Sequence, residues 1–117
     1  MEFSNITPEQ LDTAPESEVD ALPFGVIGLK PSCEVDRYSA TESRLAGLSR
    51  ERVMGRHFFN AVAPCMNNFL VAQRFEDESS LDATIDYVLT LKMRPTPVKL
   101  RLLRQADRDR RYILVQR

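Results

Sequence analysis

Cys65 is the residue whose setting best suits covalent chemistry. It follows Pro64, and Phe58, Phe59 and Val62 precede it at helical spacing. A short helix here would turn one face to a core, and Pro64 would end it, because proline clashes with the preceding turn and lacks an N–H. The thiol of Cys65 is therefore expected just past a helix end, beside an aromatic wall. Such a thiol could carry an attached group, and it could equally be an inert core cysteine.

Tyr38 and Glu42 form a second candidate pair, because side chains four residues apart lie on the same face of a helical turn. A phenol and a carboxyl held side by side can bind one oxygen atom of a ligand between them. If both are buried, desolvation raises the pKa of Glu42, so its carboxyl can stay protonated and donate a hydrogen bond. Spacing alone, however, favours an exposed tyrosine beside an exposed glutamate.

Two other side chains are weaker candidates. His57 is the only histidine and could pair with Cys65 as a nucleophile, but no third residue of such a site is evident. Helical spacing also turns His57 away from the face of Phe58. Cys33 is interpreted as an ordinary strand residue. The chain is therefore not expected to be an enzyme.

Short elements must position these residues. Residues 1–21 are polar and acidic and are expected to form a small helical cap, with Thr7 as an N-cap and Pro8 in the first helical position. Apolar alternation and turn residues predict strands at 24–29, 33–38, 83–93, 98–103 and 112–116. Short helical pieces are expected at 39–43, 50–54 and before Pro64, with a longer helix at 68–79 that buries Phe69, Ala72 and Phe75.

These elements predict an α+β domain over residues 22–117. Hairpins pair strands antiparallel, which favours a five-stranded antiparallel sheet with the helices against one face. The order of the elements is also that of PAS domains. A PAS fold alone decides no function, because such folds serve ligand binding, cofactor binding and protein contacts.

Composition excludes several classes of function. A chain of 117 residues is long enough for one domain with a modest core. The net charge of −1 gives no general attraction to nucleic acid or to an anionic membrane. No apolar run approaches the roughly 20 residues of a membrane span. The two cysteines match no metal-binding spacing, and a reducing, cytoplasmic setting fits them best.

The segment around Cys65 resembles a known family. It reads Gly55-Arg56-His57-Phe58-Phe59 and then Val62-Ala63-Pro64-Cys65, which is similar to the segment of photoactive yellow proteins that ends in their chromophore-bearing cysteine. In that family a tyrosine and a glutamate in Tyr-x-x-x-Glu spacing bind the phenolate of p-coumaric acid, which is held as a thioester on the cysteine. Tyr38, Glu42 and Cys65 fall on these positions. The likeness covers roughly residues 22–117.

The resemblance implies a PAS-fold blue-light receptor. Cys65 would carry p-coumaric acid, and Tyr38 and a protonated Glu42 would donate hydrogen bonds to its phenolate. Phe58 and Val62 would line the site. Met93 matches a family methionine near the chromophore, although core packing explains it as well. Light would isomerise the chromophore, Glu42 would lose its proton and become an unpaired buried carboxylate, and the N-terminal cap would move and signal to an unknown downstream protein.

This chain departs from the family at two polar positions of the implied pocket, and Leu89 and Leu91 also stand where the family tends to have aromatic residues. Ala46 stands where the family usually has a threonine, and Leu48 where it usually has an arginine. Both changes imply a less polar pocket. Two other functions remain open. Cys65 could accept an aryl or acyl group from a coenzyme A thioester in a biosynthetic pathway, with no light involved, or the chain could be a ligand-free PAS interaction module.

Overall fold

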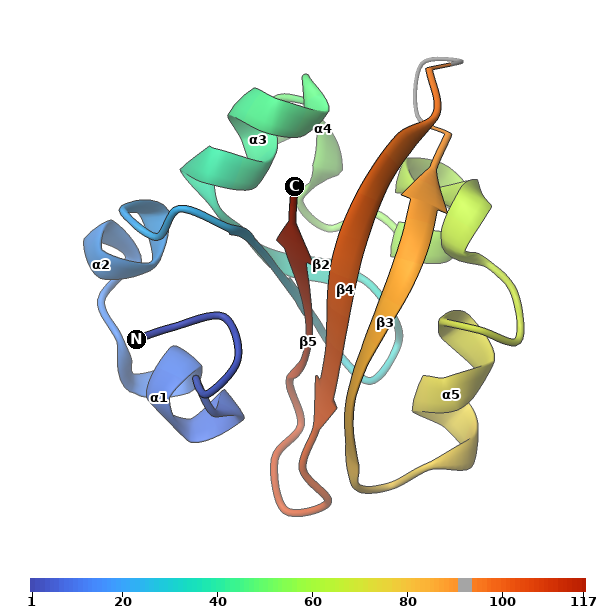
Figure 1. Ribbon diagram of the computed structural model, residues 1–117. Coiled ribbons are helices and arrows are strands. Elements are labelled where there is room, and N and C mark those ends of the chain that lie inside the picture. Colours follow the sequence, from blue (N-terminus) through green and yellow to red (C-terminus); the bar gives the residue numbers. More distant parts are fainter. Residues whose placement is uncertain (91–93) are drawn as a thin grey trace.

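One sheet organises the part of the chain that the structure describes. The computed structural model describes residues 1–90 and 94–117. The sheet consists of β1 (Gly25–Leu29), β2 (Val35–Tyr38), β3 (Leu81–Leu89), β4 (Thr96–Arg104) and β5 (Arg111–Gln116). Neighbouring strands are antiparallel, in the order β2-β1-β5-β4-β3. The predicted five-stranded antiparallel sheet is therefore confirmed, and the first strand pairs with the last at its centre (Figure 1).

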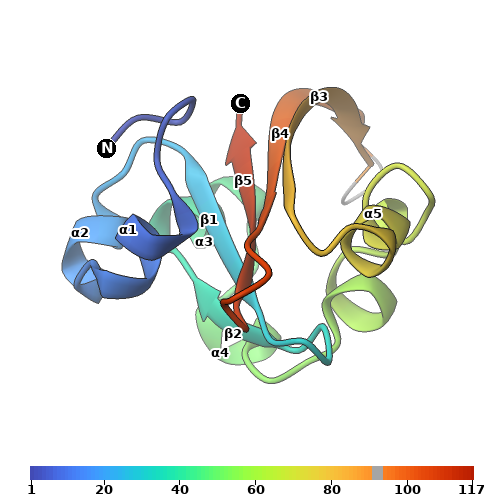
Figure 2. The ribbon, with the colours of Figure 1, turned by 90° about the horizontal axis from the view of Figure 1, so that it is seen from below.

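Short helices cover both faces of this sheet. They are α1 (Pro8–Thr13), α2 (Glu16–Asp20), α3 (Ala40–Ala46), α4 (Arg50–Val53), the π-helical turn η1 (Phe58–Val62), the 3₁₀ turn η2 (Pro64–Met66) and α5 (Ala72–Asp77). Figures 1 and 2 show α1 and α2 on one side of the central strand β5 and α5 on the other. Among the residues described, no helix is long and apolar enough to cross a membrane.

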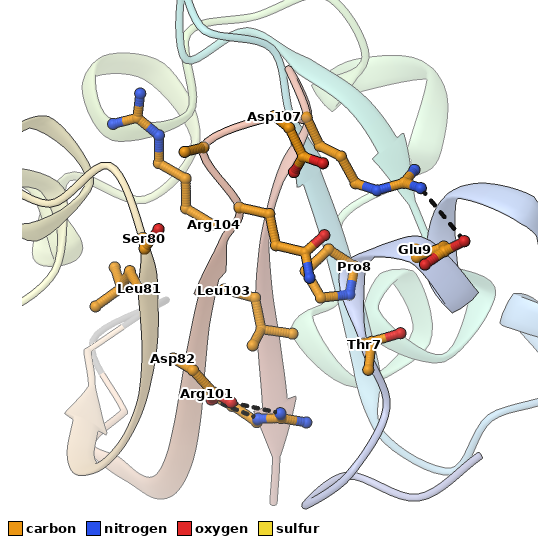
Figure 3. A pocket seen from close by; sticks show the side chains of 13 residues that line it. Thr7, Pro8, Glu9, Ser80, Leu81, Asp82, Arg101, Leu103, Arg104 and Asp107 are labelled. Carbon is orange, nitrogen blue, oxygen red and sulfur yellow. Dashed lines mark hydrogen bonds and ion pairs between the residues drawn. The ribbon is translucent and has the colours of Figure 1, made fainter.

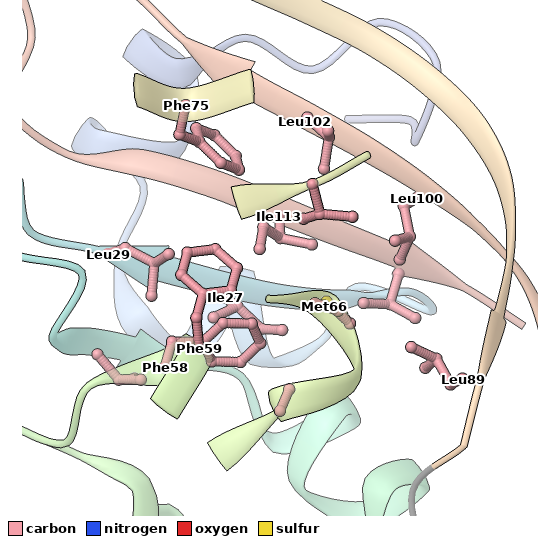
Figure 4. Close-up of a cluster of buried hydrophobic side chains, with 14 of the residues drawn as sticks. Ile27, Leu29, Phe58, Phe59, Met66, Phe75, Leu89, Leu100, Leu102 and Ile113 are labelled. Atoms are coloured by element: carbon pink, nitrogen blue, oxygen red, sulfur yellow. The ribbon is translucent and has the colours of Figure 1, made fainter. Parts of the chain in front are cut away.

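Each face of the sheet has its own core, because side chains alternate along a strand. Along β5, Ile113 and Val115 enter the larger core under α4, η1, η2 and α5, which we call the main core. Tyr112 and Leu114 enter the smaller core against the N-terminal helices, which we call the cap core. Figure 4 shows the main core, where the rings of Phe58 and Phe59 meet edge to face with centroids 5.2 Å apart.

The first helix begins as the sequence predicts. Thr7 is its N-cap and Pro8 its first residue. The Thr7 hydroxyl accepts a hydrogen bond from the Gln10 N–H at 3.1 Å, and the Gln10 side chain accepts one from the Thr7 N–H at 2.9 Å. This reciprocal pair satisfies two N–H groups that a helix start leaves without partners.

A buried arginine ties the N-terminal segment to the sheet. Arg101 on β4 is 5% exposed, and its Nη1 donates to the carbonyls of Phe3 at 2.9 Å and Ile6 at 2.8 Å. Its Nε and Nη2 donate to the Asp82 carboxylate of β3, both at 2.9 Å. This cluster borders an open hollow of about 690 Å³ between α1, strands β3 and β4, and the turn that follows β4 (Figure 3). Neither Cys65 nor Glu42 lines that hollow.

The longer helix predicted at 68–79 is wrong in its first turn. The observed helix, α5, starts at Ala72, and Phe69, which was expected to be buried, is 77% exposed. The cause is Asn68, whose side-chain oxygen accepts hydrogen bonds from the N–H groups of Leu70 at 3.0 Å and Val71 at 3.2 Å. Such a local side-chain bond offers the backbone an alternative to the helix, and Val71 enters the main core instead.

Two strand boundaries also differ from the prediction. The second strand starts at Val35, because Cys33 has a φ of +69° and therefore cannot continue a strand. Strand β3 starts at Leu81, and its predicted alternation is confirmed up to Leu89. The predicted continuation through residue 93, including Met93, lies outside the described residues.

Candidate functional site

The turn that carries Cys65 rests on the main core. Phe58 and Phe59 are 1% and 2% exposed, while Val62 and Cys65 are partly buried and pack against the same core. The predicted helix ends before Pro64, but Pro64 itself opens the turn η2, so Cys65 lies within a second short turn and not just past a helix end. Proline is well suited to the first position of such a turn.

Two side chains that the sequence analysis missed hold the backbone of Cys65. The Tyr87 hydroxyl of β3 donates to the Cys65 carbonyl at 2.5 Å, and the Asn68 side-chain nitrogen donates to the same carbonyl at 3.2 Å. That nitrogen is also 2.7 Å from the Tyr87 hydroxyl. The inward position of Tyr87 in an alternating strand was a usable signal, but nothing in the sequence named its partner.

Removing this hydroxyl tests the turn. We expect Tyr87→Phe to lower the free energy of unfolding by about 1 kcal/mol, the net worth of one hydrogen bond, and to speed hydrogen exchange of amides in η2. Tyr112→Phe is the matched control, because the Tyr112 hydroxyl donates to Asp12, on the opposite face, at 2.5 Å. Urea titration and amide exchange measure both effects. Equal exchange rates in η2 for the two variants would show that Tyr87 does not support Cys65.

Tyr38 and Glu42 are both buried, at 3% and 2% exposure, so the exposed pair that spacing alone favours is wrong. Tyr38 ends β2, and Glu42 lies in the first turn of α3. Between them, the Ser39 hydroxyl accepts hydrogen bonds from the N–H of Glu42 at 3.1 Å and of Val26 at 3.0 Å. Ser39 therefore caps α3 and fastens its start to β1. The Ser-x-x-Glu pattern was an available signal for this cap.

Arg117, which follows β5, is a partner of Glu42 that the sequence analysis did not find. Its Nη1 and Nη2 lie 2.7 and 3.2 Å from the two carboxyl oxygens of Glu42. Burial raises the pKa of Glu42, and Arg117 offsets this rise only in part. Burial and the nearby charge of Glu42 also raise the pKa of Tyr38. The expectation that an ionised Glu42 is unpaired is therefore wrong for this arrangement.

The remaining predicted residues are placed as follows. Phe58 belongs to the main core, and Val62 packs against it. Met93 lies outside the described residues. His57 accepts a hydrogen bond from the Asn60 N–H at 3.2 Å through its Nδ1 and so caps η1. Cys33 packs against the main core, and burial raises the pKa of its thiol.

The two departures from the family pattern differ in their surroundings. Ala46 is buried at 7% exposure, near the end of α3. Leu48 packs against the main core and, together with Val62, lines an open hollow of about 350 Å³. Arg52 and Arg56 line the same hollow. The structure thus brings guanidinium groups near Leu48, although Leu48 itself has no charge.

These residues suit an aromatic ligand with an acidic hydroxyl. Tyr38 and Phe58 are members of the main core, and Cys65 and Val62 pack against it. Glu42 is close enough to raise the pKa of Tyr38 by its charge. A phenol and a carboxyl that are both buried can share one anionic oxygen, and a partly exposed thiol can hold the other end of a ligand. The chemistry of this set of groups therefore fits p-coumaric acid.

Comparisons with known proteins identify relatives of this chain. A scan against models of protein families finds no match. The chain is 33% identical over 105 residues to a protein named Photoactive yellow protein from Rhodothalassium salexigens, which covers 87% of this chain and 84% of that one. The photoactive yellow protein domain of the sensor histidine kinase Ppr from Rhodospirillum centenum is 40% identical, with a TM-score of 0.85 over 93% of this chain and 98% of that one.

A more distant solved structure supports the fold alone. The PAS domain of an HTR-like protein from Haloarcula marismortui is 13% identical, and it superimposes with a TM-score of 0.70 over 92% of this chain and 97% of that one. The predicted PAS fold is therefore confirmed.

Proposed function

The chain belongs to the photoactive yellow protein family, and on that basis we propose that it is a photoreceptor that carries p-coumaric acid as a thioester on Cys65. The observation that carries this proposal is the burial of both Tyr38 and Glu42, with Tyr38 in the main core on which the Cys65 turn rests. An exposed pair would have no means of holding a phenolate away from water. The proposal assigns no catalysis to the chain.

Attachment would exchange one thioester for another. The sulfur of Cys65 would attack the carbonyl carbon of an activated p-coumaroyl thioester, such as that of coenzyme A. The new carbon–sulfur bond would form as the old one breaks, and the carrier would leave as a thiol with the proton that Cys65 gives up. The step needs no oxidant or reductant. Tyr87 and Asn68 would keep the backbone of Cys65 in place during this exchange.

Tyr38 and a protonated Glu42 would donate hydrogen bonds to the phenolate oxygen. Bonds to an anion are short and strong, and a site of low dielectric constant strengthens them further. When bound, the chromophore supplies a double bond that isomerises on absorbing light. Glu42 would then give its proton to the phenolate oxygen. Phe58 and Val62 would pack against the chromophore and exclude water.

The signal would pass through the N-terminal helices to another protein. Helices α1 and α2 are short and lie over the face opposite to the Cys65 turn. Their cap core is smaller than the main core, and segments with fewer buried contacts open more readily, so we propose that they move when the charge of Glu42 changes. The Rhodospirillum relative is a domain of a sensor histidine kinase, and a downstream signalling protein is proposed here as well. Two free cysteines suit a cytoplasmic setting.

Reconstitution tests the proposal against its alternatives. The purified chain is mixed with activated p-coumaric acid and followed by visible absorption and intact mass. We expect one added hydroxycinnamoyl group and a visible band that bleaches under blue light. Added mass without a visible band would favour the role as an acyl or aryl acceptor in biosynthesis. No added mass would favour the ligand-free interaction module and contradict the proposal.

A further inference from the structure

We propose that Arg117 is a positioning residue that holds the Glu42 carboxyl and sets its affinity for a proton. The importance of this role for light sensing rests on the proposed function. The role itself belongs to the protein without a chromophore, so it can be tested there.

The Arg117–Glu42 pair has bidentate geometry, with a forked guanidinium group facing a carboxylate. Two guanidinium nitrogens of Arg117 bond the two oxygens of Glu42, at 2.7 and 3.2 Å. The side chains of Arg117 and Glu42 are 17% and 3% exposed, so water screens the pair little. Arginine suits this role better than lysine, because its planar group matches both oxygens at once and stays charged.

The backbone of β1 makes room for this arrangement. A Cβ atom at Gly25 would lie 2.0 Å from the Glu42 Oε1 atom and 2.9 Å from its carboxyl carbon. Gly25 pairs with Val115 in the register of β1 and β5, and Arg117 follows two residues after Val115. The Glu42 carboxyl therefore lies directly over the glycine, with the end of β5 beside it.

The positive charge of Arg117 acts mainly on the carboxyl group of Glu42. Among the described residues, Arg117 beyond β5 is the charged group that acts on the Glu42 carboxyl, while the neighbouring phenol of Tyr38 from β2 is neutral near pH 7. A buried carboxylate with an arginine partner is far less unfavourable than an unpaired one. Arg117 therefore supports one negative charge at this place, on Glu42 itself or on an anionic ligand oxygen beside it.

Arg117 supplies a positive charge that Leu48 lacks at the position where the family usually has an arginine. Leu48 supplies no positive charge, whereas Arg117 approaches the Tyr38–Glu42 pair from the end of β5. A phenolate bound beside a protonated Glu42 and a neutral phenol beside an ionised Glu42 both carry one negative charge. Arg117 can balance either form, so proton transfer from Glu42 leaves its carboxylate with a partner.

Titration of Glu42 in the chromophore-free protein tests this role. The carboxyl carbon is observed by ¹³C NMR from mildly acidic to alkaline pH, and its resonance is identified by its loss in Glu42→Gln. We expect Arg117→Ala to raise the apparent pKa of Glu42 by about 1–3 pH units, the usual effect of one close opposite charge. Arg117→Lys should give a smaller rise, because it keeps the charge and loses the fork. Arg44→Ala, which removes an exposed arginine of α3, is the matched control and should leave the titration unchanged.

Stability as a function of pH gives a second readout. The pKa of Glu42 is raised in the folded protein, so its contribution to stability is present below the unfolded pKa, about 4.3, and is lost as the pH rises through the folded value. Arg117→Ala raises the folded pKa further. The variant should therefore melt close to the unchanged protein at low pH and fall increasingly below it toward neutral pH.

The outcomes separate this inference from the proposed function. An unchanged Glu42 titration in folded Arg117→Ala and Arg117→Lys would overturn the role of Arg117, whatever the chromophore does. A variant that loses stability equally at all pH values would also overturn it, because the arginine would then be merely structural. If the chain failed to take up p-coumaric acid while the Arg117 variants still shifted the titration of Glu42, the proposed function would be contradicted. The role of Arg117 would then remain supported.

Discussion

Cys65→Ala is expected to abolish covalent loading, whereas Cys33→Ala should load as fully as the unchanged chain. A thioester needs a sulfur atom, and alanine has none. Cys33 is a poor substitute, because burial raises the pKa of its thiol and so lowers its thiolate fraction. Intact mass after reconstitution measures the result. The expected difference is the presence or absence of one hydroxycinnamoyl group per chain.

The two variants control for each other. Cys33 and Cys65 are both partly buried and both pack against the main core. Each change to alanine removes one sulfur atom and keeps the Cβ atom, so the two variants lose the same amount of side chain. A loss of loading caused by general damage to the core would therefore affect both variants. Peptide mapping that placed the added group on Cys33 would contradict the assignment of Cys65.

The parts of the fold that the sequence predicts depend on local patterns. Alternation along β3 shows which side chains face inward, and the cap of α1 lies within a few residues of Thr7. Both features follow from a repeat or a short-range bond, which any single sequence displays. The resemblance around Cys65 is also local, and it located the turn on which the proposed chemistry depends.

The parts that the sequence could not predict depend on distant pairing. Glu42 and Arg117 are 75 residues apart, and they meet because β1 pairs with β5 at the centre of the sheet. No periodicity in either segment names the other. Asn68 shows a second reason, because its side chain stops a helix that the apolar pattern favours. A single competing hydrogen bond can thus outweigh the weak propensity of a helix's first turn.

The same distant pairing explains why the residues of the proposed site come from several strands of the sheet and not from one sequence motif. Tyr38 ends β2, Glu42 is fastened to β1 through Ser39, and Arg117 follows β5. The Cys65 turn is held from β3 through Tyr87. A shift of any of these strands would change the site, so we expect its proton affinity and its folding to be closely coupled.

Arg101→Leu is expected to release the N-terminal segment from the sheet. The variant removes the donors that bond the carbonyls of Phe3 and Ile6 and leaves both carbonyls without those partners. Each buried group left unsatisfied costs about 1–3 kcal/mol, so for two carbonyls we expect a loss of about 2–6 kcal/mol in the free energy of unfolding. The segment can also detach, so that water bonds the two carbonyls. The loss in the free energy of unfolding then cannot exceed the free energy with which the segment packs on the sheet.

Amide hydrogen exchange shows whether Arg101→Leu loosens the N-terminal segment. The amide of Ile6 bonds the Glu2 carbonyl at 2.9 Å, so its exchange reports on opening of the segment. A loss of 2 kcal/mol corresponds to exchange about 30-fold faster. Lys99→Leu is the matched control on β4, because the Lys99–Asp86 pair is exposed, with side chains 56% and 85% exposed, and such pairs contribute about 0–1 kcal/mol. If the Ile6 amide exchanged no faster in Arg101→Leu than in Lys99→Leu, packing of the cap core alone would hold the segment. The arginine would then have no part in anchoring it.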